Sequence, residues 1–188
     1  MLFDQKTVDK IVQMARKQEH LLITIDGPCA SGKTTFAAQL SQMIPAVVVH
    51  TDDYVIPHAQ KTKERLSIPG GNCDAERLFR EVIRPWKQYQ SIRMRRYDCA
   101  ADCLLPEETL PDSKALILEG SYCNLPLIRQ EADLRLFLDV IWDTRKERLQ
   151  KRESTESLKR FYECWIPLEN AYFSAFGLPD AGCLVIKA

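Results

Sequence analysis

The segment formed by residues 27–34 constrains the fold of this chain more than any other feature of the sequence. It reads Gly-Pro-Cys-Ala-Ser-Gly-Lys-Thr and follows the apolar run Leu-Leu-Ile-Thr-Ile-Asp. This is the P-loop pattern, G-x-x-x-x-G-K-[ST], in its expected place between a strand and a helix. Gly27 and Gly32 allow a tight turn whose successive N–H groups surround phosphate oxygens, and the N-terminus of the next helix adds its dipole. The segment therefore predicts a nucleoside triphosphate site.

The two residues that end the motif carry the chemistry of such a site. Lys33 is expected to reach the β- and γ-phosphates of ATP, and the hydroxyl of Thr34 is expected to ligate Mg²⁺. A glycine turn in a protein that binds no phosphate would not explain why a lysine and a threonine occupy these two positions. The residues expected to hold the nucleotide are Gly27, Pro28, Cys29, Ala30, Ser31, Gly32, Lys33, Thr34 and Thr35.

Short apolar runs typical of buried strands alternate with amphipathic segments along the chain. Strands are expected at residues 21–26, 46–50, 92–97, 115–119, 134–140 and 183–186, and helices at 7–18, 33–43, 74–88, 144–153 and 159–176. Such alternation predicts a parallel sheet with right-handed crossovers. The expected fold is α/β, a three-layer α/β/α P-loop fold with a mainly parallel sheet, in a single domain over residues 1–188. Locally, the first helix should pack beside the first strand, Pro85 should kink or end its helix, and Asp143 should cap the helix after it.

Composition narrows the class of protein. The formal net charge of the 188 residues is zero, which gives no hint of a nucleic-acid partner or an acidic membrane surface. No apolar run is long enough to span a bilayer, and the first ten residues lack the pattern of a signal peptide. The seven cysteines are scattered, which favours reduced thiols and a cytoplasmic protein. Cys99 and Cys103 have no second pair or nearby histidine, so a zinc site is not expected.

Carboxylates follow the strands at the edge of the sheet where a ligand would bind. In parallel sheets this edge lies at the carboxyl ends of the strands. The second strand is followed by Asp52 and Asp53, and Glu119 ends a later one. Either aspartate could accept the proton of a hydroxyl that attacks ATP, and Glu119 could support Mg²⁺ through water. Alternatively, the aspartates cap a turn and Glu119 accepts backbone N–H groups.

The segment after the fourth core strand carries a row of arginines. Arg145, Arg148 and Arg152 are spaced by three and four residues, which places them on one helical face, and Arg160 follows. They could form a lid over about residues 144–160 that closes on the phosphates. A solvent-exposed face with ordinary ion pairs explains the same pattern. The three tryptophans, Trp86, Trp142 and Trp165, are expected in the core.

The order and spacing of these motifs resemble the uridine kinase-like family of P-loop nucleoside kinases. The matching segments are residues 26–35, 51–54, 72–74, 96–98, 118–122 and 134–152. The resemblance implies that Asp52 is the catalytic base, that Asp74 holds ribose hydroxyls, and that Tyr97 contacts the nucleobase. It implies further that Glu119 supports Mg²⁺ and that arginines of the lid bind phosphates.

Two positions depart from the pattern of that family. Pyrimidine-specific members carry a histidine where this chain has Asp102, and the aromatic pair after the base aspartate is kept only in part. Its retained member, Tyr54, is expected to contact the substrate. The kinase chemistry therefore transfers better than the specificity for uridine.

The sequence as a whole predicts an enzyme that uses Mg²⁺ and ATP to phosphorylate a hydroxyl group of a small molecule. A nucleoside is the first candidate acceptor; pantothenate, a sugar and nicotinamide riboside are alternatives. A nucleotide-binding regulator without transferase activity is a further alternative, although it would have no use for a base such as Asp52. The oligomeric state is left open.

Overall fold

A five-stranded, wholly parallel sheet forms the centre of the molecule. The computed structural model describes residues 5–187, and the strands of this sheet follow the order β2-β7-β1-β8-β9. Their bounds are Leu21–Asp26 (β1), Ala46–His50 (β2), Ala115–Glu119 (β7), Leu134–Asp139 (β8) and Cys183–Lys187 (β9). The predicted α/β fold is confirmed, and each strand of the sheet lies where its apolar run predicted it to within one residue.

Two apolar layers sandwich the sheet because successive side chains of a strand point to opposite faces. Leu21, Ile23 and Ile25 pack with α1 (Gln5–Lys17) and α2 (Lys33–Met43) on one face. Leu22 of the same strand faces the other layer, which contains Leu78 and Tyr172. Helices thus cover both faces, and the first helix packs beside the first strand as predicted.

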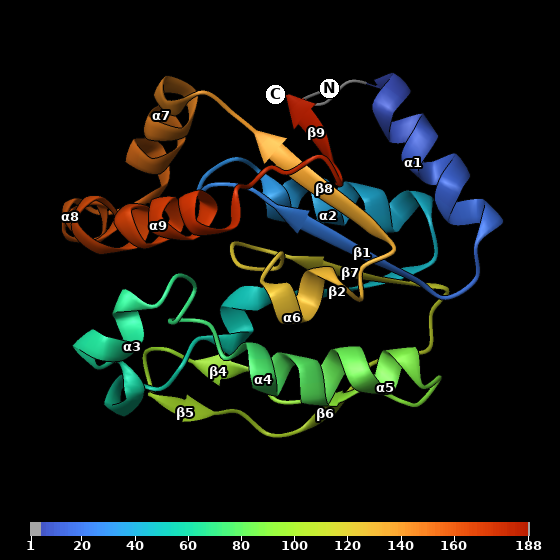
Figure 1. Cartoon of the computed structure of the whole chain (residues 1–188), viewed down its shortest axis with the longest axis horizontal. Helices are drawn as coiled ribbons and strands as arrows, with labels where there is room; N and C mark the ends of the chain where they lie inside the picture. Colours follow the sequence, from blue (N-terminus) through green and yellow to red (C-terminus); the bar gives the residue numbers. More distant parts are fainter. Residues whose placement is uncertain (1–4, 188) are drawn as a thin grey trace.

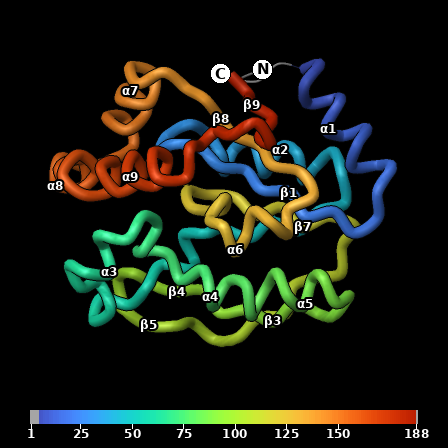
Figure 2. The backbone as a smooth tube through the Cα atoms, in the orientation of Figure 1, coloured from blue at the N-terminus to red at the C-terminus, as the bar shows by residue number. Residues whose placement is uncertain are grey.

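The other helices come from two distant parts of the chain. Figures 1 and 2 show α3, α4 and α5 below the sheet and α7, α8 and α9 to the left of it. The remaining bounds are Lys63–Ser67 (α3), Ala75–Leu78 (α4), Arg84–Lys87 (α5), Pro126–Arg129 (α6), Trp142–Arg152 (α7), Thr155–Arg160 (α8) and Ile166–Phe176 (α9).

Two π-helical turns let helices continue through a proline. The segment Phe79–Ile83 joins α4 to α5, and the segment Phe161–Trp165 joins α8 to α9. In each case the residue before the proline donates its N–H five residues back, from Arg84 to Phe79 and from Ile166 to Phe161. Proline has no N–H to donate, so a regular α-helix would leave one carbonyl without a donor. The wider π turn accommodates this missing hydrogen bond. The helix therefore continues past Pro85 to Lys87 instead of ending there, and the π turn is the irregularity that accompanies the proline.

Other local expectations also needed correction. Asp143 lies inside α7, whose N-cap is Ile141, so it does not cap the helix. Residues 92–97 do not form one strand: β3 (Arg93–Met94) pairs with β6 (Glu108–Thr109), and β4 (Tyr97–Asp98) pairs with β5 (Cys103–Leu104), both antiparallel. Short hairpins of this kind carry too few residues for a clear hydrophobic period. Among the helices of residues 5–187, none has the length and apolar character needed to cross a membrane.

Candidate active site

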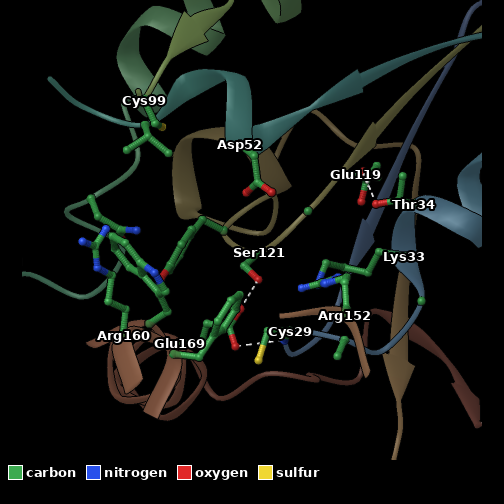
Figure 3. Close-up of a pocket in the computed structure, with 18 of the residues that line it drawn as sticks. Cys29, Lys33, Thr34, Asp52, Cys99, Glu119, Ser121, Arg152, Arg160 and Glu169 are labelled. Atoms are coloured by element: carbon green, nitrogen blue, oxygen red, sulfur yellow. Dashed lines mark hydrogen bonds between the residues drawn. The ribbon is translucent and has the colours of Figure 1, made fainter. Parts of the chain in front are cut away.

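A cavity of about 750 Å³ opens at the carboxyl edge of the sheet. Its walls come from the P-loop, from the turns after β2 and β7, and from the helices α7 to α9. Figure 1 shows β1 and β8 pointing toward the side where these helices lie. Ligands of open α/β sheets bind at this edge. The cavity is therefore the candidate active site (Figure 3).

The P-loop takes the shape that its two glycines allow. Gly27 has a φ of 141°, and a Cβ there would lie 2.6 Å from the carbonyl oxygen of Leu138. Gly32 has a φ of 97° and is the N-cap of α2, whose first residue is Lys33. The N-terminus of α2 and its dipole therefore face the cavity, where they favour an anion. The ammonium of Lys33 lies in the loop and donates to the carbonyl of Gly27 at 2.7 Å.

A buried carboxylate anchors the start of the loop. Asp26 is fully buried and accepts hydrogen bonds from the N–H of Gly27 at 2.7 Å, the N–H of Asn124 at 3.1 Å and the hydroxyl of Tyr172 at 2.7 Å. Burial raises the pKa of Asp26 to about 6, although these hydrogen bonds and the charge of Lys33 act in the opposite direction. Asp26 thus ties β1, the turn after β7 and α9 to the loop.

The turn after β2 presents Asp52 to the cavity. Residues Thr51–Tyr54 form a 3₁₀ turn, held by a 2.8 Å hydrogen bond from the Thr51 hydroxyl to the carbonyl of Ser121. A Cβ on Gly120 would lie 2.0 Å from that hydroxyl, so only glycine permits this approach. Asp52 lines the cavity, whereas Asp53 is not among the described residues that do. The surrounding protein desolvates the Asp52 carboxylate and raises its pKa, and the charges of Glu119 and Glu169 add to that effect.

Thr34, the last residue of the P-loop motif, meets Glu119 in the wall of the cavity. Glu119 is 4 % exposed and accepts a 2.9 Å hydrogen bond from the Thr34 hydroxyl. His50 Nδ1 lies 2.5 Å from the same carboxylate oxygen, and this hydrogen bond raises the pKa of His50.

This donor set fits Mg²⁺, which prefers oxygen ligands and binds through one or two protein groups together with substrate phosphates. Because Thr34 donates its proton to Glu119, a lone pair of its oxygen stays available to a cation. Within residues 5–187 no group of three acidic, histidine or cysteine side chains could enclose a metal by itself.

Two of the three arginines of α7, Arg145 and Arg148, contact the P-loop. Arg148 donates to the carbonyls of Ala30 at 3.2 Å and Ser31 at 3.1 Å, and it lines the cavity. Arg152 also lines the cavity and pairs with Glu153 at 2.7 Å. Arg145 donates to the carbonyls of Val140 at 3.1 Å and Cys29 at 3.4 Å, but it is not among the described lining residues. The helical face predicted from their spacing therefore turns toward the P-loop and the cavity at Arg145 and Arg148, whereas Arg152 at the cavity rim is 58 % exposed.

Tyr54 and Asp74 belong to a buried ion-pair cluster around Arg77. The guanidinium of Arg77 lies 4.1 Å from the centre of the Tyr54 ring and 3.4 Å from an Asp74 carboxylate oxygen. Asp74 also caps α4 by accepting the N–H of Arg77 at 3.1 Å. Tyr97 is 5 % exposed, and its hydroxyl donates to Asp102. None of the three residues implied to bind substrate is among the described residues that line the cavity.

Glu169 is a cavity residue that the sequence did not reveal. Its carboxylate is buried, at 6 % exposure, and accepts the N–H of Cys29 at 2.9 Å and the hydroxyl of Ser121 at 2.5 Å (Figure 3). Glu169 is the one acidic residue of the largely apolar helix α9, and this was a signal that could have found it. Trp165, one turn earlier, lines the cavity, and Trp142 is 38 % exposed, so only Trp86 of the three tryptophans lies in the core as predicted.

Comparisons with known proteins identify the family and the fold of the chain. The model of the phosphoribulokinase/uridine kinase family matches residues 22–157. The fold is similar to that of a protein from Bacillus stearothermophilus described as a "possible uridine kinase", with a TM-score of 0.71, 22 % identity, and coverage of 96 % of this chain and 97 % of that one. It is also similar to D-glycerate 3-kinase from Cryptococcus neoformans, with a TM-score of 0.68, 13 % identity, and coverage of 98 % and 94 %. No curated protein matches the sequence.

The family match covers well over half of the chain and includes the P-loop, the Asp52 turn, Glu119 and the arginines of α7. Its members are kinases rather than passive nucleotide binders, which sets aside the alternative of a regulator without transferase activity. The chain belongs to the phosphoribulokinase/uridine kinase family and is a small-molecule kinase.

Proposed function

We propose that the enzyme transfers the γ-phosphoryl group of ATP to a hydroxyl group of its acceptor, with Asp52 as the general base. The observation that carries this proposal is the position of Asp52, which opens into the same cavity as Lys33 and the Thr34–Glu119 pair. A base must reach the acceptor hydroxyl while the phosphate lies on the other side of that hydroxyl. A raised pKa makes Asp52 a stronger proton acceptor than an ordinary aspartate, because a base is more effective when its pKa approaches the working pH.

The residues on the P-loop side have electrostatic roles in this proposal. Lys33 and the N-terminus of α2 bind the phosphates, and Arg148 and Arg152 face the charge that spreads over the phosphoryl group during transfer. Thr34 and Glu119 hold Mg²⁺, which when bound neutralises the triphosphate charge and orients the β- and γ-phosphates. Arg145 supports the loop through the carbonyl of Cys29.

The acceptor class is the less constrained part of the proposal. The sequence resemblance implies a nucleoside, and the family match is compatible with one. The residues that carried that implication, Tyr54, Asp74 and Tyr97, are engaged with Arg77 and Asp102 instead. Pantothenate, sugars and nicotinamide riboside therefore remain in the panel of acceptors to be tested.

The test compares Asp52→Asn with Asp53→Asn, because the two aspartates are neighbours and only the first lines the cavity. ADP release is measured with and without each acceptor, and ATP affinity is measured separately by competition with a fluorescent nucleotide. We expect Asp52→Asn to lower turnover by roughly 10²–10⁴-fold, the usual contribution of a general base, while ATP affinity is kept. Asp53→Asn should behave like the parent. Near-normal turnover in Asp52→Asn would overturn the assignment of the base.

A further inference from the structure

The end of the cavity away from the P-loop has a cationic wall. Lys61, from the segment after the Asp52 turn, and Arg160, at the end of α8, both line the cavity there. Figure 3 shows Arg160 and Cys99 on one side of Asp52, and Lys33 and Arg152 on the other. The base thus lies between two groups of cations. The phosphates of ATP account for the group beside the P-loop, and they leave the other group without a function.

The π-helical turn Phe161–Trp165 builds one side of this wall. The N–H of Ile166 bonds to the carbonyl of Phe161, so one turn of helix here holds an additional residue. As a result Arg160, Phe161 and Trp165 all line the cavity, although an α-helix would spread residues at such spacings around more of its surface. Isolated π turns inside helices are frequent at functional sites, because they redirect side chains in this way.

Lys61 approaches the same place from the other side of the cavity. Its ammonium lies 5.8 Å from the centre of the Trp165 ring, a cation–π distance that joins the two walls. Within residues 5–187, no carboxylate forms an ion pair with Lys61. Arg160 pairs only with Glu156, at 3.2 Å, and both side chains are largely exposed, which makes that pair weak. The charge of Lys61 contributes to lowering the pKa of Asp102, but this carboxylate does not reach ion-pair distance, so both cations can turn to an anionic ligand.

The carboxylates that line the cavity lie elsewhere. They are Asp52, Glu119 and Glu169, at the centre of the cavity and beside the P-loop. Lys61 and Arg160 share their end of the cavity with aromatic and small side chains, including Phe161, Trp165 and Cys99. A neutral nucleoside or sugar would offer no charge to Lys61, and none to Arg160 beyond its exposed pair with Glu156.

We infer that the acceptor is an alcohol that carries a negative group, a carboxylate or a phosphate, which Lys61 and Arg160 bind while its hydroxyl faces Asp52. The guanidinium of Arg160 suits the paired oxygens of either anion, and the ammonium of Lys61 adds a second charge. The rings of Phe161 and Trp165 cover the carbon skeleton between the two ends. This inference rests on the proposed kinase activity and assigns the substrate class at the same site.

The experiment uses a matched set of acceptors that differ in charge: ribose, ribonate and ribose 5-phosphate, with uridine as a neutral nucleoside. ADP release is measured for each at several ionic strengths. We expect the enzyme to prefer one or both anions, and the KM for that anion to rise with salt, because exposed charges are screened. The comparison of ribonate with ribose 5-phosphate distinguishes a carboxylate from a phosphate. Preference for ribose or uridine over both anions would overturn the inference and leave the kinase proposal standing.

Variants test the two cations directly. Lys61→Met and Arg160→Met should each raise the KM for the anionic acceptor by about tenfold or more, which corresponds to about 1.4 kcal/mol, while the KM for ATP stays unchanged. Lys63→Met and Lys159→Met are the matched controls, because these lysines are close in sequence and are not among the described lining residues. Equal effects of the test and control variants would contradict the inference.

A binding measurement decides the inference even where none of the four compounds is phosphorylated. Ribonate and ribose 5-phosphate should raise the melting temperature of the parent in the presence of a non-hydrolysable ATP analogue, and ribose should not, because a ligand that binds only the folded state stabilises it. Lys61→Met should lose this shift. If neither anion produces a shift that depends on Lys61, the inference is wrong, whereas the base assignment is still judged by Asp52→Asn.

Discussion

Replacing Glu169 by glutamine tests whether α9 holds the P-loop through a charge. The carboxylate accepts the N–H of Cys29 on one oxygen and the Ser121 hydroxyl on the other, at 2.9 and 2.5 Å. Glutamine keeps the size of the side chain. Its oxygen can accept the N–H of Cys29, and its NH₂ can donate to the Ser121 hydroxyl, which rotates to accept. The substitution therefore removes the charge and preserves both contacts.

The size of the effect follows from those two hydrogen bonds. A hydrogen bond to a charged group contributes about 1.5–3 kcal/mol and a neutral one about 0.5–1.5 kcal/mol, so neutralising both bonds should lower the free energy of unfolding by about 2 kcal/mol. Glu169→Ala should lower it further, because the buried N–H of Cys29 then has no acceptor, which adds about 1–3 kcal/mol. The order of stability expected is parent, then glutamine, then alanine.

The same substitution should change the pH dependence of catalysis. The charge of Glu169 is one of the causes that raise the pKa of Asp52, after desolvation and the charge of Glu119. Removing that charge lowers the pKa of Asp52. A base must be unprotonated to act, so the acidic limb of the kcat/KM profile should move to lower pH in Glu169→Gln.

Urea unfolding and a pH profile of ADP release are the two assays. The control is Glu163→Gln on the same helical run, since Glu163 is 64 % exposed and only reaches Lys159 at 4.0 Å. We expect this control to match the parent in both assays. If Glu169→Gln is as stable as Glu163→Gln and has an unshifted acidic limb, the carboxylate neither anchors the loop nor acts on Asp52.

Three further predictions concern the P-loop and its neighbours. Lys33→Ala should lower turnover by roughly 10²–10³-fold with an unchanged fold, because the transition-state charge loses its fixed counter-charge; full activity in a folded variant would contradict the phosphate-binding role. Arg148→Ala should lower turnover more than ATP affinity, and more than Arg152→Ala does, because Arg148 also holds two loop carbonyls; kinetics of both variants with ATP and acceptor varied check this order. Asp26 has a folded-state pKa of about 6 against an ordinary 3.8, so the folded state binds its proton more tightly than the unfolded state does. The stability that this group contributes is therefore complete below pH 3.8 and is lost as the pH rises to about 6, a fall of about 3 kcal/mol in the free energy of unfolding. Urea unfolding across that range should show the fall in the parent and not in Asp26→Asn, and a parallel pH dependence in both would refute it.

Local patterns were enough to predict the sheet and the P-loop. The apolar runs of β1 and β7 indicate, within a few consecutive residues, strands that are buried on both faces, and the run of β2 predicts the edge strand beside them, which is only partly buried. The conformation of the P-loop depends on Gly27 and Gly32, and the position of Lys33 follows from being next in the chain. Asp52 follows β2 by two residues and Glu119 is the last residue of β7, so the rule for parallel sheets placed both at the carboxyl edge of the sheet.

Three residues that the family resemblance implied in substrate binding, Tyr54, Asp74 and Tyr97, are not among the described residues that line the cavity. Tyr54 and Asp74 follow the motif order, yet a buried arginine from the next helical turn, Arg77, engages both. The sequence does not reveal that Arg77 contacts these two side chains, because the energy of an ion-pair cluster depends on which groups the fold desolvates together. Tyr97 is likewise engaged by Asp102, the residue at which the chain departs from the family pattern.

The sequence by itself determined the class of fold, the nucleotide site and the edge of the sheet where the chemistry lies, because each depends on residues that are neighbours in the chain. Only the tertiary structure decided which side chains line the end of the cavity away from the P-loop. Glu169 meets Cys29 across 140 positions, and Lys61 meets Trp165 across the cavity. No spacing rule links such residues, because their contact exists only after the helices α7 to α9 have packed over the carboxyl edge of the sheet. The charge and shape of the end of the cavity away from the P-loop are for that reason properties of the folded molecule.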